Sequence, residues 1–216
     1  MSSLSRLPVD RTSLREKVAT ALRAAIISGE MQPGQIYSAP SLGARFGVSA
    51  TPVREAMLDL LREGMVSIAP NKGFRVTEID DAELDQITQL RLLIEPPVGR
   101  LVTPLIPTSD LPELRRLAQV IVTEAEAGDL PAYTEADRVF HLTLLGYANN
   151  PRIVELIGEL RGQTRLTGLT RLLESGQLVD SAREHLAIVD AIQTRDADAV
   201  QRLLQVHIGH VRDLWA

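Results

Sequence analysis

The stretch Gly47-Val-Ser-Ala-Thr-Pro-Val-Arg54 decides how the first third of this chain folds. A glycine favours the end of one helix. Ser49 or Thr51 can cap the next helix, because a proline such as Pro52 is tolerated only in a first helical turn. The new helix therefore starts with small and polar residues and carries Arg54 close behind them. Such a start suits the major groove of DNA, because small residues let the backbone approach and an arginine can reach a guanine edge or a phosphate.

Apolar residues at helical spacing flank this stretch on both sides. They predict a first helix that ends at Gly29 and a second helix over 40–46 that buries Leu42 and Phe46. The third helix begins in the stretch itself and stops at Gly64. Three short helices in sequence are thus expected before any strand.

The period of the apolar residues falls to two after the third helix, which is typical of strands. Two strands are predicted around the tight turn Pro70-Asn71-Lys72-Gly73. Three helices followed by a hairpin is the order of a winged helix-turn-helix. A DNA-binding domain is therefore predicted over 12–78, after a loose arm over 1–11. The hairpin tip, with Asn71, Lys72 and Gly73, suits a sugar-phosphate or minor-groove contact.

Each of these polar residues also has a plain structural interpretation. Ser49 and Thr51 can be helix caps and nothing more. Arg54 can pair with Asp59 or Glu55 nearby, and Lys72 can be a solvated turn residue. The order of these features along the chain, rather than any one residue, indicates DNA binding.

Charge is distributed unevenly between the two parts of the chain. The net charge of −5 is the sum of +3 over residues 1–78 and −8 over residues 79–216. A basic part joined to an acidic part is expected when only the first part meets phosphate. The lack of cysteine excludes disulfides and zinc-thiolate sites, and no apolar run suggests a membrane span or a signal peptide. We therefore expect a cytoplasmic protein.

The second part of the chain, over 79–216, shows only helical patterns. A helix is predicted from Asp80 or Asp81 to about Ile94, with a break or kink at Pro96-Pro97 and a continuation to about Leu105. Further helices are predicted at about 110–128, 131–148, 151–174, 178–194 and 196–215. The chain is thus mainly α, a winged helix-turn-helix followed by an all-α bundle of six or seven helices.

All four histidines lie in this second part. Asp137 and His141 are four residues apart on one predicted helix and so share a face. His185 and His207 lie on two later helices, and a bundle core is where facing helices bring ligands together. Three imidazole nitrogens and a carboxylate oxygen suit Zn(II), Ni(II) or another divalent first-row ion. The alternative is that these are ordinary hydrogen-bonded histidines.

The motifs at 47–56, 61–66 and 70–73 resemble the signature of GntR-family regulators, and the resemblance covers 12–78. It implies that Ser49, Thr51, Arg54, Asn71, Lys72 and Gly73 contact DNA. The family usually carries an arginine where this chain has Ala50, which can make at most an apolar contact. A weaker or altered operator preference is therefore expected.

The later motifs, over about 80–213, are similar to the FCD ligand-binding domain of the FadR subfamily. Asp137-Arg-Val-Phe-His141, Glu184-His185 and the pair Asp196 and His207 carry the likeness. It implies a metal held by Asp137, His141, His185 and His207, next to a small carboxylate effector. Arg91 has two open interpretations, the effector carboxylate or an i+4 pair with Glu95. Arg161 is expected on a solvated face, and His210 on the surface.

Together these features predict a regulator, not an enzyme. It would bind a pseudo-palindromic operator as a homodimer and act as a repressor, and a small organic acid on the metal would control it. The alternative is a metal-responsive regulator in which the ion itself is the signal. A metal-dependent enzyme with a DNA-binding domain is disfavoured, because only Glu184 or Tyr147 offers a general base.

Overall fold

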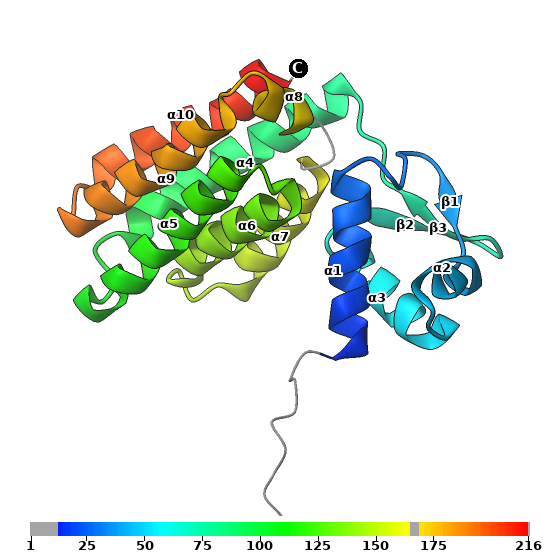
Figure 1. Ribbon diagram of the computed structural model, residues 1–216. Coiled ribbons are helices and arrows are strands. Elements are labelled where there is room, and N and C mark those ends of the chain that lie inside the picture. The colour runs from blue at the N-terminus through cyan, green and yellow to red at the C-terminus, as the bar shows by residue number, and fades with distance from the viewer. Residues whose placement is uncertain (1–12, 165–168, 216) are drawn as a thin grey trace, which may run out of the picture.

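The computed structural model describes the fold of residues 13–164 and 169–215, and the predicted arm over 1–11 lies outside these residues. The chain forms an N-terminal unit of three helices and a small sheet, beside a C-terminal bundle of helices (Figure 1). The expected mainly α architecture is thus confirmed.

The N-terminal unit follows the predicted order of elements, with one addition. Its elements are α1 (Leu14–Ile27), β1 (Ile36–Tyr37), α2 (Ala39–Phe46), α3 (Ala50–Arg62), β2 (Val66–Ala69) and β3 (Gly73–Val76). Ser13 caps α1 through a reciprocal capping box with Glu16, and Gly47 ends α2 in the left-handed conformation. A core of aliphatic and methionine side chains, among them Leu22, Met57 and Leu60, holds the helices against the sheet.

The wing is a three-stranded antiparallel sheet in the order β1-β3-β2, where a two-stranded hairpin was expected. β1 joins the free edge of β3, with Tyr37 opposite Phe74. Gly73 makes this possible, because a β-carbon there would overlap the carbonyl oxygen of Tyr37. One burial prediction was wrong, since Phe46 is 37% exposed.

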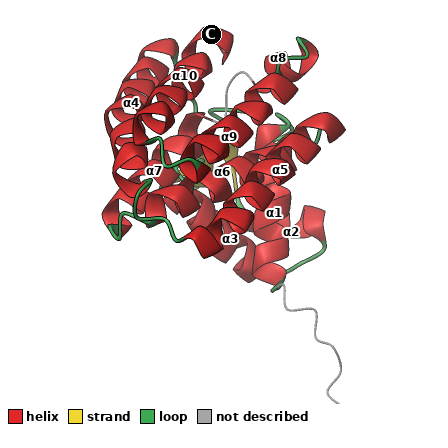
Figure 2. Cartoon of the chain, turned by 90° about the vertical axis from the view of Figure 1, so that its left-hand side faces the viewer, coloured by secondary structure: helices red, strands yellow, loops and turns green. Residues whose placement is uncertain are grey.

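In the part of the C-terminal unit that the structure describes, seven α-helices, α4 to α10, form a bundle, within the range that the sequence predicts. They are α4 (Asp81–Val102), α5 (Leu111–Ala127), α6 (Leu130–Gly146), α7 (Pro151–Thr164), α8 (Leu169–Glu174), α9 (Leu178–Gln193) and α10 (Ala197–Trp215), with a short 3-10 turn, η1 (Thr108–Asp110), before α5. Figure 2 shows α4 and α10 side by side at one flank of the bundle. Gly99 permits this approach, because a β-carbon there would overlap a methyl group of Leu204.

The expected interruption of α4 at Pro96-Pro97 does not occur as a break, because the helix is continuous from Asp81 to Val102. A proline removes the hydrogen bond to the carbonyl four residues earlier. Pro97 leaves the carbonyl of Leu93 without its usual helical donor. Both residues lie on the exposed side of α4, so water can donate a hydrogen bond to this carbonyl instead. The single predicted helix over 151–174 includes residues 165–168, which lie outside the described residues, and the structure has α7 before them and α8 after them.

The two units meet where α1 packs beside α6 and where the end of α3 lies against the end of α7 (Figure 1). Among the described helices, none combines the length and apolar character needed to cross a lipid bilayer.

Candidate metal centre and DNA-binding surface

Four side chains that are far apart in the sequence come together inside the bundle. Asp137 and His141 lie on α6, His185 on α9 and His207 on α10. Each offers one ligand atom, and these atoms all lie within 4.8 Å of one another. The three histidines are buried, and Asp137 is 9% exposed. These are the four residues predicted from the sequence.

The spacing of the ligand atoms fits a first-row metal ion. The Nε2 atoms of His141 and His185 are 3.1 Å apart, and Asp137 Oδ1 lies 3.2 Å from His185 Nε2 and 3.7 Å from His141 Nε2. Zinc–nitrogen bonds of about 2.0–2.1 Å in a tetrahedron place neighbouring ligand atoms about 3.3 Å apart. The three distances among Asp137, His141 and His185 bracket that value, and His207 lies within 4.8 Å of these atoms.

Oxygen atoms behind the histidines orient their rings. The Nδ1 of His185 lies 3.0 Å from the carbonyl oxygen of Ala182, and the Nδ1 of His207 lies 2.8 Å from Glu184 Oε2. The Nδ1 of His141 lies 3.4 Å from Glu95 Oε2. A carbonyl or carboxylate can only accept, so a proton on each Nδ1 satisfies these oxygens and leaves the lone pair of each Nε2 for a metal. This is the tautomer that binds a metal through Nε2.

The environment also keeps two of the histidines neutral. Burial, reinforced by the charge of Arg161, holds the pKa of His141 well below its usual value. Burial together with the neighbouring His185 lowers the pKa of His207 to about 4. Both rings are therefore in their ligand form at neutral pH, without any cost of removing a proton.

A buried network of arginines and carboxylates adjoins the four residues. Arg161 donates to Asp137 Oδ2 at 2.8 Å and to Glu95 Oε2 at 2.7 Å. Arg91 donates to Glu95 Oε1 at 2.7 Å and approaches the Thr164 hydroxyl at 3.5 Å. Burial alone would raise the pKa of Glu95, but the charges of Arg161 and Arg91 outweigh it and hold that pKa well below its usual value.

The expected solvated position of Arg161 was wrong, because the residue is only 3% exposed. The spacing contained the signal, since Ile157, Leu160, Arg161 and Thr164 form one buried stripe of α7 at helical intervals. For Arg91, the structure contains the i+4 pair with Glu95. His210 is 39% exposed and its Nδ1 lies 2.8 Å from Glu184 Oε1, so it joins the edge of the cluster.

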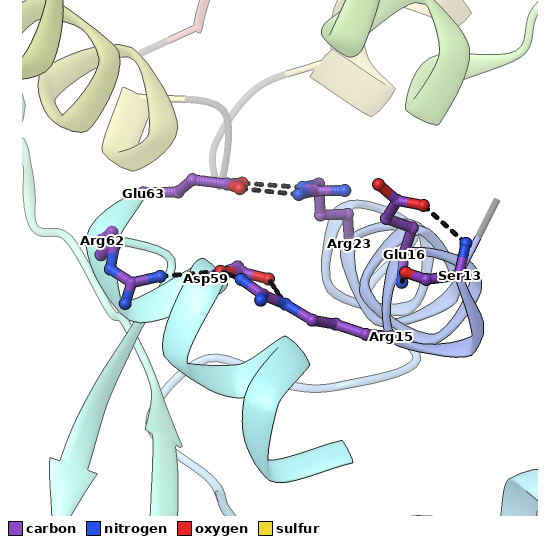
Figure 3. A pocket seen from close by; sticks show the side chains of 7 residues that line it. All are labelled: Ser13, Arg15, Glu16, Arg23, Asp59, Arg62 and Glu63. Atoms are coloured by element: carbon purple, nitrogen blue, oxygen red, sulfur yellow. Dashed lines mark hydrogen bonds and ion pairs between the residues drawn. The ribbon is translucent and has the colours of Figure 1, made fainter. Parts of the chain in front are cut away.

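The predicted DNA contacts of α3 lie on its exposed side. Ser49, Thr51 and Arg54 are all exposed at the start of the helix. Ser49 occupies the N-cap position, but its side chain makes no capping hydrogen bond. Of the two alternative partners for Arg54, Asp59 is engaged elsewhere, since it bonds Arg15 and Arg62 (Figure 3). Within the described residues no ion pair involving Arg54 is found.

The tip of the wing combines exposed and structural residues. Asn71 and Lys72 are exposed, and Asn71 adopts a left-handed backbone with φ of 61°. Asparagine tolerates that conformation well. Gly73 has φ of 131° and, as described above, no space for a β-carbon. Its main role in the structure is therefore to let β1 approach.

Comparison with known families accounts for both units. The description "FCD domain" matches residues 86–210, which is more than half of the chain, and "Bacterial regulatory proteins, gntR family" matches residues 9–76. The chain belongs to the GntR family. It is a DNA-binding transcriptional regulator with an FCD domain, and the predicted family resemblance is confirmed.

Relatives that match along most of the chain are consistent with this family assignment. The "HTH-type transcriptional repressor RspR" of Escherichia coli (strain K12) is 28% identical, over 93% of this chain and 88% of the relative. The "Gluconate operon transcriptional repressor" of Bacillus licheniformis is 26% identical, over 96% of this chain and 88% of the relative. The solved structure "E. coli McbR/YncC" is similar with a TM-score of 0.74 and 27% identity, covering 92% of this chain and 94% of that one. These relatives are transcriptional regulators rather than enzymes.

Proposed function

We propose that this GntR-family regulator is a repressor whose operator binding is controlled by a small carboxylate at a divalent metal in the helical domain. The supporting observation is the convergence of Asp137, His141, His185 and His207 on one point. In this proposal residues 12–78 bind DNA and residues 79–216 sense the effector and form the dimer. The protein would act in the cytoplasm, where bacterial DNA lies.

The charges around the four residues favour an anionic effector once a metal is bound. Two arginines, Arg91 and Arg161, and three carboxylates lie in or beside the set of four residues, with Glu95 and Asp137 bonded to the arginines and Glu184 bonded to His207. A divalent ion would change the balance of this buried group from one negative to one positive charge. Because an uncompensated buried charge is costly, a carboxylate is the favoured additional ligand. We propose Arg91 as its second contact, because a guanidinium binds a carboxylate with two parallel hydrogen bonds.

A homodimer is the natural partner of a pseudo-palindromic operator, because two half-sites match a two-fold axis. Leu90, Leu93 and Leu101 lie exposed at related positions along α4, with Leu93 66% exposed. An exposed apolar surface of this kind supports a contact with a second copy.

The control by metal and acid predicts a stepwise thermal response. A chelator should lower the melting temperature, and Zn(II) or Ni(II) should raise it by several degrees. Ligand at 100 times its Kd stabilises by about 2.7 kcal/mol, and each kcal/mol corresponds to about 2–4 °C at this chain length. A panel of small mono- and dicarboxylic acids, gluconate included because one relative is named for a gluconate operon, should add a further rise only in the metal-loaded protein.

The same titration separates the alternatives. If the metal raises the melting temperature and no acid of the panel adds to it, the protein is a metal-responsive regulator without an organic effector. If neither metal changes the melting temperature, both forms of the proposal are wrong.

For DNA binding, we expect Arg54→Ala to weaken binding by about tenfold or more, since a good arginine–guanine contact contributes about 1–3 kcal/mol. The probe is a DNA fragment selected from a random pool with the wild-type protein, and the readout is fluorescence anisotropy. Lys72→Ala should reduce the slope of log K against log salt by about one, as loss of one phosphate contact does. Arg152→Ala, an exposed arginine at the start of α7, is the control and should bind like wild type. Equal losses in Arg54→Ala and Arg152→Ala would contradict the assignment of α3 as the DNA-binding helix.

A further inference from the structure

The last turn of α7 contacts the DNA-binding unit on one side. On the other side it contacts the buried cluster, by which we mean Asp137, His141, His185 and His207 with the adjoining Glu95, Arg91 and Arg161. Within four consecutive residues, the side chains of Arg161 and Thr164 face the cluster, where they meet Asp137, Glu95 and Arg91. Gly162 and Gln163, between them, face the end of α3. One short segment thus has a contact on each side.

The contact with α3 is made at backbone distance. A β-carbon at Gly162 would overlap the carbonyl oxygen of Glu63. A β-carbon at Gly64 would lie 2.9 Å from Cγ of Gln163 and 3.3 Å from Cγ of Glu159. Glycines on both sides therefore bring α7 and the end of α3 closer than side chains would permit. Closely packed atoms without a compressible layer transmit displacement rather than absorb it.

Glu63 is well placed to pass such a displacement to the DNA-binding unit. It is the C-cap residue of α3, the helix that carries Arg54. Its carboxylate also accepts two hydrogen bonds of 2.7 Å from Arg23 on α1 (Figure 3). A shift of the Glu63 backbone would thus act on α3 and α1 together.

On the other side, Arg161 shares Asp137 with the histidines. Asp137 Oδ2 accepts from Arg161, while Asp137 Oδ1 faces His185. Any ligand that draws Asp137 toward the histidines changes the bonds that hold Arg161. The residue next to Arg161 in the chain is Gly162. Only one peptide unit therefore separates the residue that bonds Asp137 from the residue that contacts Glu63.

We propose that the contact of Gly162 with Glu63 couples the state of the buried cluster to the position of α3. This inference rests on the proposed function in one respect, that a metal binds the cluster. The alternative is that Gly162 is only a packing contact between two units. Coupling predicts that a change at the cluster alters the end of α3, whereas a simple packing contact predicts no such effect.

Hydrogen exchange of the wild-type chain, with and without Zn(II), is the first test. Coupling predicts that zinc changes the exchange of amides over residues 58–66 at least severalfold. If zinc binds, as measured by calorimetry, and exchange over 58–66 stays the same, the coupling is wrong while the proposed metal site stands. If zinc does not bind, the proposed function fails. Arg161→Met then serves as the change at the cluster, and unaltered exchange over 58–66 overturns the coupling.

Gly162→Ala is the second test, because its methyl group must push α7 and Glu63 apart. The matched control is Gly158→Ala, one turn earlier on α7, where a β-carbon would meet Leu142 at an ordinary 3.5 Å. Zinc affinity should stay within about threefold of wild type in both variants, an energy difference below about 1 kcal/mol. The zinc-dependent change over 58–66 should be lost in Gly162→Ala and kept in Gly158→Ala. A Gly162→Ala variant that binds zinc and retains the full change would overturn the proposal. If this variant does not fold, the wild-type exchange measurement alone decides.

Discussion

Replacing His185 with alanine is expected to lower the affinity of the chain for Zn(II) by more than about 100-fold. His185 Nε2 lies 3.1 Å from His141 Nε2 and 3.2 Å from Asp137 Oδ1, so it is close to two of the other proposed ligand atoms. Even groups that only orient a metal ligand typically contribute about 10- to 100-fold to affinity, so loss of a ligand itself should exceed that range. Competition with a chromophoric chelator measures the change, and the thermal rise on adding zinc should disappear with it.

His210→Ala is the matched control for this experiment. His210 lies on the same helix as His207 and also contacts Glu184, but it is half-exposed and is not among the four clustered residues. Its loss should affect zinc affinity far less than the loss of His185. Equal losses in the two variants, or zinc binding by His185→Ala at wild-type strength, would refute the site.

The winged helix-turn-helix could be predicted because its signals are local. Caps, stops and the change of period lie within a few residues of the elements that they define, as at Gly47 and Gly64. The strand β1 was missed for the same reason, since two residues have no period of their own. It forms only because Gly73, far along the chain, leaves room for it.

In the helical domain, sequence spacing predicts contacts within one helix but not contacts between helices that are distant in the sequence. The i, i+4 spacing of Asp137 and His141 puts both on one face of α6, but no spacing says that His185 and His207 meet them there. That expectation came from the general tendency of a helical bundle to bring ligands together in its core, and from the family resemblance. Arg161 was misplaced because arginines are mostly exposed, and its partners lie 24 and 66 residues away. Partners at such distances appear only when the helices are packed.

Arg161→Met is expected to lower the free energy of unfolding by about 3–5 kcal/mol in the presence of a chelator, since removing one partner of a buried ion pair leaves an uncompensated charge. Methionine retains much of the side-chain volume, so the effect is electrostatic rather than a cavity. Asp137 loses the hydrogen bond from Arg161 to its Oδ2, and Glu95 loses those from Arg161 to its Oε2 while keeping the one from Arg91. Urea unfolding monitored by circular dichroism gives the value.

Two comparisons test whether the lost ion pairs of Arg161 cause the lower stability of Arg161→Met. Arg100→Met removes the partner of Asp198 at an exposed pair, which solvent screens, so little loss of stability is expected. Adding Asp137→Asn to Arg161→Met removes one of the two carboxylates that lose Arg161, so the double variant should be more stable than Arg161→Met alone. If Arg161→Met is no less stable than Arg100→Met, the buried network does not contribute to the fold as described.

Zinc should reduce the cost of Arg161→Met, and this links the stability of the bundle to its proposed ligand. Asp137 has one oxygen toward Arg161 and the other toward the histidines. A cation held by the histidines compensates the same carboxylate that the arginine leaves behind. The loss measured in zinc should therefore be smaller than the loss measured with a chelator, whereas the effect of Arg100→Met should be the same in both. An equal cost of Arg161→Met in both solutions would mean that the metal and Arg161 act on Asp137 independently, and the coupling through Gly162 would then lose its source.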